Sequence, residues 1–183
     1  TFTRALFGQD KWDAARTLSA GNRDLILRVG ESATLDTSRP LTGIRIQMNW
    51  TAAIDLDLHA FYRMSDGRER HVYFRNKDDL QVRLDHDSGI GDLGGQNQEN
   101  IVIEQLAGIE DVIFATHIYG DGDRFCDYDA KVTVETKNGD TFTVPLSAQQ
   151  RAEWCVIARI DNRNPAQPRV VNENRVSEDK PRF

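Results

Sequence analysis

The sequence predicts an all-β protein: a two-sheet β-sandwich with a short N-terminal helix and an irregular C-terminal tail. Short apolar runs recur about every ten residues along most of the chain. In GIRIQMNW, residues 43–50, strict alternation places Ile44, Ile46, Met48 and Trp50 on one buried face. No long helical pattern separates the runs, so parallel βαβ units are disfavoured and a sandwich is favoured.

The elements divide the chain into three parts. Residues 1–20 form an N-terminal extension, in which Leu6, Phe7 and Trp12 have the spacing of a short amphipathic helix. Residues 21–162 carry the apolar runs, with turn signals SDG at 65–67 and NG at 138–139, and form the sandwich domain. Residues 163–183 are rich in Pro and Asn, which predicts an arm or tail; whether it is flexible or packs on the body stays open.

Charge is unevenly distributed along the chain. Between Asp55 and Asp129 there are 17 Asp and Glu against 7 Lys and Arg, although the whole chain has a net charge of −6. An acidic middle argues against nucleic acid, which needs a basic groove, and favours cations. No run approaches the roughly 20 apolar residues of a membrane span. The chain has two cysteines without metal spacing, which is typical of a reducing compartment, so we expect a cytoplasmic location.

Paired aspartates on a strand are the first candidate metal ligands. In AIDLDLHAFY, period-2 geometry points Asp55 and Asp57 to the face opposite Leu56 and Leu58, roughly 7 Å apart. Hydrophobic packing alone does not require two such carboxylates between core residues.

A glycine-rich acidic loop follows at residues 84–100, LDHDSGIGDLGGQNQEN. Glycines allow the backbone to turn its carbonyls inward, and Ca²⁺ takes six to eight oxygen ligands at about 2.3–2.6 Å. The candidate ligands in this segment are Asp85, Asp87, Ser88, Gly89, Gly91, Asp92 and Glu99. Ile90 and Gln96 stand where an EF-hand needs Gly and Glu, and no Lys follows the glycines as a phosphate loop requires. A solvated acidic rim remains the alternative to a metal site. A second acidic segment, GDGDRFCDYD at 120–129, could add ligands from a neighbouring loop, but a plain turn is the favoured interpretation.

The order of several motifs resembles the TerD family of bacterial tellurium-resistance and stress proteins, and the match is closest to its TerA-like branch. The motifs are Trp50, DLDLHAFY, VYFRN, LDHDSG, GGQNQENIVI, DVIFATHIY and WCVIARIDN, in that order across residues 25–162. The resemblance implies a β-sandwich that binds two calcium ions in a cleft lined by acidic loops. It implies Asn76 as a further ligand, beside Asp55, Asp57, Asp85, Asp87, Ser88, Gly89 and Glu99. Gln96, Asn97 and Gln98 stand where acidic family members carry charges, so this chain is expected to hold one or two Ca²⁺ ions.

Three functions are compatible with these features. The first is a calcium-binding, non-enzymatic module of a tellurium-resistance or stress-response system, whose loop orders on Ca²⁺ and regulates the binding of protein partners. The second is a calcium-dependent sandwich that recognises carbohydrate or lipid headgroups without inserting into the membrane. The third, a metal-dependent hydrolase, is the weakest because no catalytic motif is present.

Overall fold

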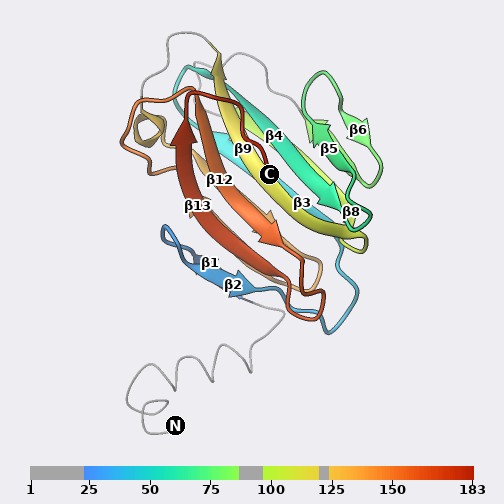
Figure 1. The fold of residues 1–183 in the computed structure, drawn as a ribbon. Helices are drawn as coiled ribbons and strands as arrows, with labels where there is room; N and C mark the ends of the chain where they lie inside the picture. The colour runs from blue at the N-terminus through green and yellow to red at the C-terminus, as the bar shows by residue number, and fades with distance from the viewer. Residues whose placement is uncertain (1–22, 87–96, 120–123) are drawn as a thin grey trace, which may run out of the picture.

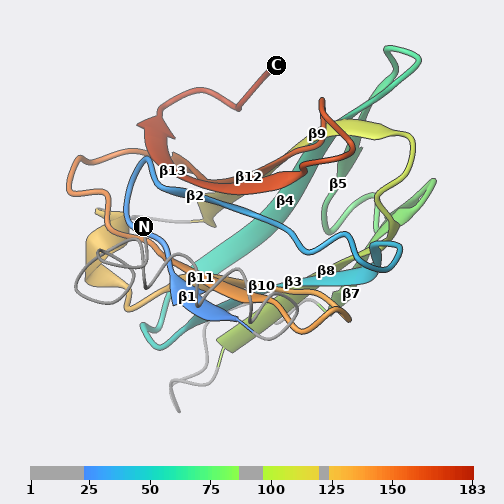
Figure 2. The same ribbon diagram turned by 90° about the horizontal axis from the view of Figure 1, so that it is seen from below.

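The computed structural model describes residues 23–86, 97–119 and 124–183. Within these residues, thirteen strands form two sheets packed face to face, and one short 3-10 helix, η1 (Phe125–Asp127), lies outside the sheets (Figures 1 and 2). This confirms the predicted all-β sandwich. The predicted N-terminal helix lies within residues 1–22, outside the described part of the chain.

The first sheet has seven strands in the order β1-β11-β10-β3-β8-β7-β6. Their bounds are β1 (Asp24–Ile26), β3 (Thr42–Trp50), β6 (Asp78–Asp79), β7 (Val82–His86), β8 (Asn97–Gln105), β10 (Lys131–Glu135) and β11 (Thr141–Pro145). Strand β1 pairs with β11 in parallel, and the other neighbours are antiparallel. The NG signal lies in the turn between β10 and β11, where Gly139 has φ +95°.

The second sheet has six strands in the order β2-β13-β12-β9-β4-β5, all antiparallel. Their bounds are β2 (Ser32–Thr34), β4 (Asp55–Met64), β5 (Glu69–Val72), β9 (Ile109–Tyr119), β12 (Trp154–Asp161) and β13 (Arg169–Ser177). The pairing register shifts on both sides of β12 between Val156 and Ala158, which marks a β-bulge.

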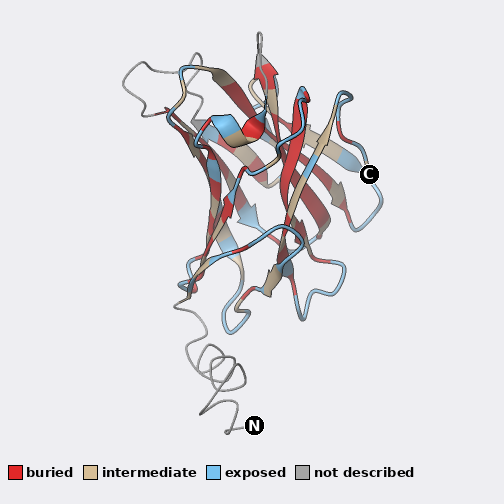
Figure 3. Cartoon of the chain, turned by 90° about the vertical axis from the view of Figure 1, so that its left-hand side faces the viewer, coloured by how far each residue is buried: buried red, intermediate tan, exposed pale blue. Residues whose placement is uncertain are grey.

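The core lies between the sheets, and the inward face of each central strand is buried (Figure 3). Ile44, Ile46, Met48 and Trp50 are all at most 1% exposed, which confirms the alternation predicted for β3. Leu56 and Leu58 are buried in the same way on β4. Cys155 is buried, Cys126 is partly exposed, and both are free thiols.

The segment after residue 162 differs from the prediction of an irregular tail. Arg169–Ser177 is strand β13, which lies between β12 and β2 in the second sheet. Val170 is fully buried, and the Asn172 side chain donates a 2.8 Å hydrogen bond to the Leu27 carbonyl. Arg169–Ser177 is therefore part of the sandwich. Its residues are mostly polar, but its pairing with β12 and β2 holds it in the sheet.

Among the described residues, no helix is long and apolar enough to cross a membrane.

Candidate metal site

Two buried acidic residues, Asp57 and Glu99, lie near the start of β4. Glu99 lies on β8 of the first sheet, and its Oε2 accepts a 2.6 Å hydrogen bond from the backbone N–H of Leu58 on β4. Asp57 is the preceding residue on β4. The Glu99 carboxylate therefore bridges the two sheets next to Asp57.

Local strand geometry explains this contact. Every second residue of β8 faces the core: Asn97, Glu99, Ile101 and Ile103. The buried face of this strand is therefore polar at its start and apolar further along. Strand β5 pairs with β4 only from Ala60 to Arg63, so Glu99 reaches the β4 edge beyond the end of that pairing. The Trp50 indole donates a 2.8 Å hydrogen bond to the Ile54 carbonyl and so positions the chain just before Asp55.

The carboxylates are held away from water. Asp57 is 6% exposed and Glu99 1%, whereas Asp55 is half-buried at the strand end. Burying an ionised carboxylate costs several kcal/mol unless a countercharge and hydrogen bonds compensate. Carboxylate and amide oxygens are the ligands that Ca²⁺ takes in proteins. The chemistry of Asp55, Asp57 and Glu99 therefore fits a hard cation.

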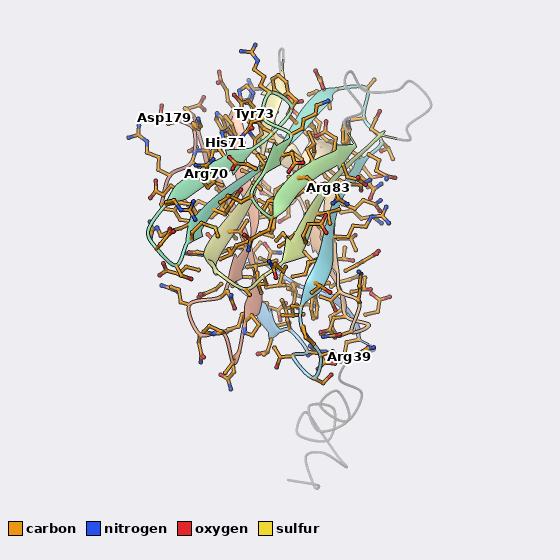
Figure 4. All side chains as sticks on the ribbon, turned by 90° about the vertical axis from the view of Figure 1, so that its right-hand side faces the viewer. Arg39, Arg70, His71, Tyr73, Arg83 and Asp179 are labelled. Carbon is orange, nitrogen blue, oxygen red and sulfur yellow. The ribbon has the colours of Figure 1, made fainter. Side chains whose placement is uncertain are left out.

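Two other predicted ligands lie in different surroundings. Asp85 lies on β7 where the pairing with β8 shifts register, and its side chain is 53% exposed, 3.8 Å from the Arg83 Nε. The Asn76 amide nitrogen donates to the His71 carbonyl at 2.8 Å and to the Asp79 carboxylate at 3.1 Å. Figure 4 shows Arg83 on the same side of the molecule as His71 and Tyr73.

The remaining predicted ligands, Asp87, Ser88, Gly89, Gly91 and Asp92, lie outside the described residues. Within residues 23–86, 97–119 and 124–183, no three His, Cys, Asp or Glu side chains are arranged to hold an ion. Asp55, Asp57 and Glu99 are therefore not brought together as a set of three metal ligands in the described part of the chain.

Two amides at this edge were not predicted as site residues. Asn97 is 2% exposed. Its amide nitrogen donates hydrogen bonds to the Trp50 and Ala52 carbonyl oxygens, both at 3.2 Å. Asn100 is 5% exposed, and its Oδ1 has no hydrogen-bond partner among the described residues. The signal was present in the sequence: Asn97 and Glu99 extend the period-2 pattern of Ile101 and Ile103 toward the acidic loop.

The second acidic segment behaves as a turn where it is described. Asp127 pairs with Arg124, with 3.2 Å between carboxylate and guanidinium. Asp129 has φ +50° and accepts a 3.0 Å hydrogen bond from the Thr51 hydroxyl. Asp121 and Asp123 lie outside the described residues.

A polar groove of about 680 Å³ lies on the outer face of the first sheet. Side-chain amides and hydroxyls of β3, β10 and β11 form much of its lining. These are Gln47, Asn49, Thr133 and Thr143. Asn97 and Gln98 line its end, so the groove begins within two residues of Glu99.

Comparison with solved structures supports the architecture. A homologue of the telluride resistance protein TerD, SCO6318 from Streptomyces coelicolor A3(2), superposes with a TM-score of 0.61 at 19% identity, over 77% of this chain and 93% of that chain. A protein of unknown function, SAV2460, superposes with the same TM-score at 14% identity, over 78% and 94%. No protein-family model and no curated protein matches the sequence. The chain thus has the sandwich fold of a TerD homologue.

Proposed function

We propose that the protein is a calcium-binding, non-enzymatic module of the TerD type that acts in a bacterial tellurium-resistance or chemical-stress system. The observation that supports the proposal is the burial of two acidic residues on strands of opposite sheets, with Glu99 accepting a hydrogen bond from the backbone N–H that follows Asp57. Carboxylate oxygens are ligands that a divalent cation such as Ca²⁺ takes in proteins.

In this account Asp55, Asp57 and Glu99 hold one side of the ion, or of two ions. The acidic glycine-rich segment, with Asp85, Asp87, Ser88, Gly89, Gly91 and Asp92, supplies further oxygens, as does Asn76. Calcium neutralises the cluster and orders the segment between β7 and β8. The ordered surface then binds a protein partner of the same system in the cytoplasm. The TerA-like assignment rests on the order of the sequence motifs and belongs to the proposal.

Calorimetric titration of the EDTA-stripped protein with calcium, and separately with magnesium, tests the ion binding. We expect micromolar calcium affinity, weaker magnesium affinity, and a loss of at least tenfold in calcium affinity for Asp57→Asn and for Glu99→Gln. Glu104→Gln is the matched control, because Glu104 lies on the same strand with an exposed side chain. Absence of binding heat in the wild type, or equal affinity in all variants, would reject the site.

The polar groove supports a second candidate function: calcium-dependent recognition of carbohydrate. Amides and hydroxyls donate and accept hydrogen bonds together, as sugar hydroxyls require, and the lining includes Asn97 and Gln98, which precede Glu99 in the sequence. A glycan array with calcium and with EDTA tests it. Calcium-dependent binding of one glycan class that is lost in Gln47→Ala/Thr133→Ala would support this function, and a blank array would reject it.

A further inference from the structure

A continuous layer of aromatic rings covers part of the outer face of the second sheet. The His71 ring stacks 4.1 Å from Phe61 and 4.1 Å from Tyr73, and His59 stacks against all three. Trp154 of β12 contacts His59 edge-on, with ring centroids 4.8 Å apart. We call this layer, made of His59, Phe61, His71, Tyr73 and Trp154, the ring face.

The chain itself covers part of the ring face. After β13, the chain runs back across β9 and β4 (Figure 1), and Phe183 packs on the cluster that contains Phe61 and Trp154. The Lys180 Nζ lies 5.7 Å from the centre of the Phe61 ring. The Arg63 guanidinium lies 4.8 Å from the centre of the Phe183 ring. Figure 4 shows His71 and Tyr73 on the side where Asp179 lies. We call residues Glu178–Phe183 the strap.

The strap is held by side chains rather than by a strand ladder. Pro181 is buried and Phe183 half-buried, but no backbone hydrogen bond joins residues 178–183 to the strands beneath, within the described chain. A hollow of about 330 Å³ remains between the strap and the strands, lined from below by Phe61, Glu69 and His71. Such a contact can open without breaking the sheet.

We propose that the ring face is a binding site for an extended basic–aromatic peptide of a partner protein, and that the strap occupies it as a built-in competitor. The chemistry of the seated strap defines the ligand: a cationic side chain over a ring, a proline, and an aromatic side chain. Ring faces attract cations, and extended peptides use such side chains as anchors. This inference does not depend on calcium.

The charges around the site fit such a ligand. Burial and the nearby Lys180 lower the pKa of His71 to about 4, so its ring is uncharged at neutral pH and does not repel a cation. Glu69 lies at the rim of the hollow, where its carboxylate is 3.3 Å from the Arg63 guanidinium and balances that charge. The Arg70 guanidinium also lines the hollow but is engaged by the Asp79 carboxylate at 2.7 Å.

Fluorescence anisotropy with a labelled synthetic peptide, VSEDKPRF (residues 176–183), tests the proposal. The peptide is titrated with full-length wild type, with Lys180→Ala/Phe183→Ala to free the ring face, and with Asp179→Ala as a control in the exposed part of the strap. We expect the double variant to bind at least tenfold more tightly than wild type and the control, with or without EDTA. Adding Phe61→Ala to the double variant should abolish binding.

Two results would overturn the proposal. One is a cooperatively melting double variant that does not bind the peptide, which would make the strap a plain part of the fold. The other is binding that persists after Phe61→Ala or is equal for a scrambled peptide, which would place the contact elsewhere. If the double variant does not melt cooperatively, Phe183→Ala alone is titrated under the same criteria. Calcium titration of these variants reports separately on the metal site.

Discussion

At the scale of single residues, Glu99 and Asp57 explain why this end of the sandwich is chemically unusual. Their side chains are buried, and Glu99 accepts the Leu58 N–H at the point where the two sheets meet. A buried carboxylate is costly to keep ionised, and carboxylate oxygens are ligands that Ca²⁺ takes in proteins. These properties make Asp57 and Glu99 candidate ligands of a cation.

Neutralising Glu99 should therefore have opposite effects with and without calcium. Glu99→Gln keeps an oxygen to accept the Leu58 N–H but removes one charge, so we expect a higher melting temperature than wild type in EDTA. In calcium at 100 times its dissociation constant, wild type should gain about 2.7 kcal/mol and the variant little. Thermal melts in EDTA and in calcium measure both effects. A variant that is less stable in EDTA yet keeps the full calcium response would contradict this account.

The ring face predicts how stability depends on pH. The His59 Nδ1 and His71 Nε2 atoms are 2.8 Å apart and share one hydrogen bond. Burial lowers the pKa of His59 to about 3, and burial with Lys180 lowers that of His71 to about 4. Both values lie below the ordinary histidine pKa of about 6.5. The unfolded chain therefore binds more protons in this window, so stability should be complete above pH 6.5 and fall toward pH 4.

Urea unfolding between pH 7.5 and pH 4 measures this dependence. His71→Gln should flatten the profile, since it removes one of the two titrating rings. The nearby charges that also face the rings are Lys180 and, beside His117, Glu153. A variant profile identical to that of wild type would contradict the assignment.

At the scale of elements, β13 and the strap that follows it are held in different ways. β13 pairs with β12 and β2, whereas residues 178–183 lack backbone hydrogen bonds to the strands in the described chain. A chain ending at residue 162 should therefore lose cooperative unfolding, and a chain ending at Ser177 should keep it. Calorimetric melting of the two truncated proteins checks this. A cooperative transition in the protein that ends at residue 162 would show that the segment after it is a dispensable tail.

Strand β13 could not be predicted from the sequence because its residues do not have a strand pattern. In RVVNENRVS, Val170 alone is a fully buried apolar side chain, and asparagine has low strand propensity. Asn172 is buried because its amide meets the Leu27 carbonyl, and Asn174 has φ +43° with its amide bonded to the Pro145 carbonyl. These contacts with distant residues outweigh the low strand propensity of asparagine. A pattern of neighbouring residues does not show them.

At the scale of the whole molecule, the alternating strands could be predicted because each has one buried face. Their pairing order could not, because β1 joining β11 or β13 joining β2 depends on contacts more than a hundred residues apart. The metal site is an intermediate case. Asp57 and Glu99 were named from spacing and resemblance, but the contact of Glu99 with β4 depends on how the two sheets pack.

Asp140 is one residue that makes such contacts with segments far away in the sequence. It is fully buried and accepts hydrogen bonds from the Arg23 Nε at 3.0 Å and from the Asp36 N–H at 2.8 Å. It thus joins the β10–β11 turn to segments that flank β1 and β2. Asp140→Ala should destabilise the fold by about 3 kcal/mol, because it breaks a buried ion pair. Urea unfolding measures the loss, with exposed Asp66→Ala as the control; equal stability of the two variants would contradict this role.

The central claim is that calcium binds between the sheets at Asp57 and Glu99. A crystal structure of the protein grown in calcium, with anomalous difference data, tests it most directly. We expect an anomalous peak within about 2.3–2.6 Å of carboxylate oxygens of both Asp57 and Glu99. A calcium peak elsewhere on the surface, or none at this edge of the sandwich, would contradict the claim.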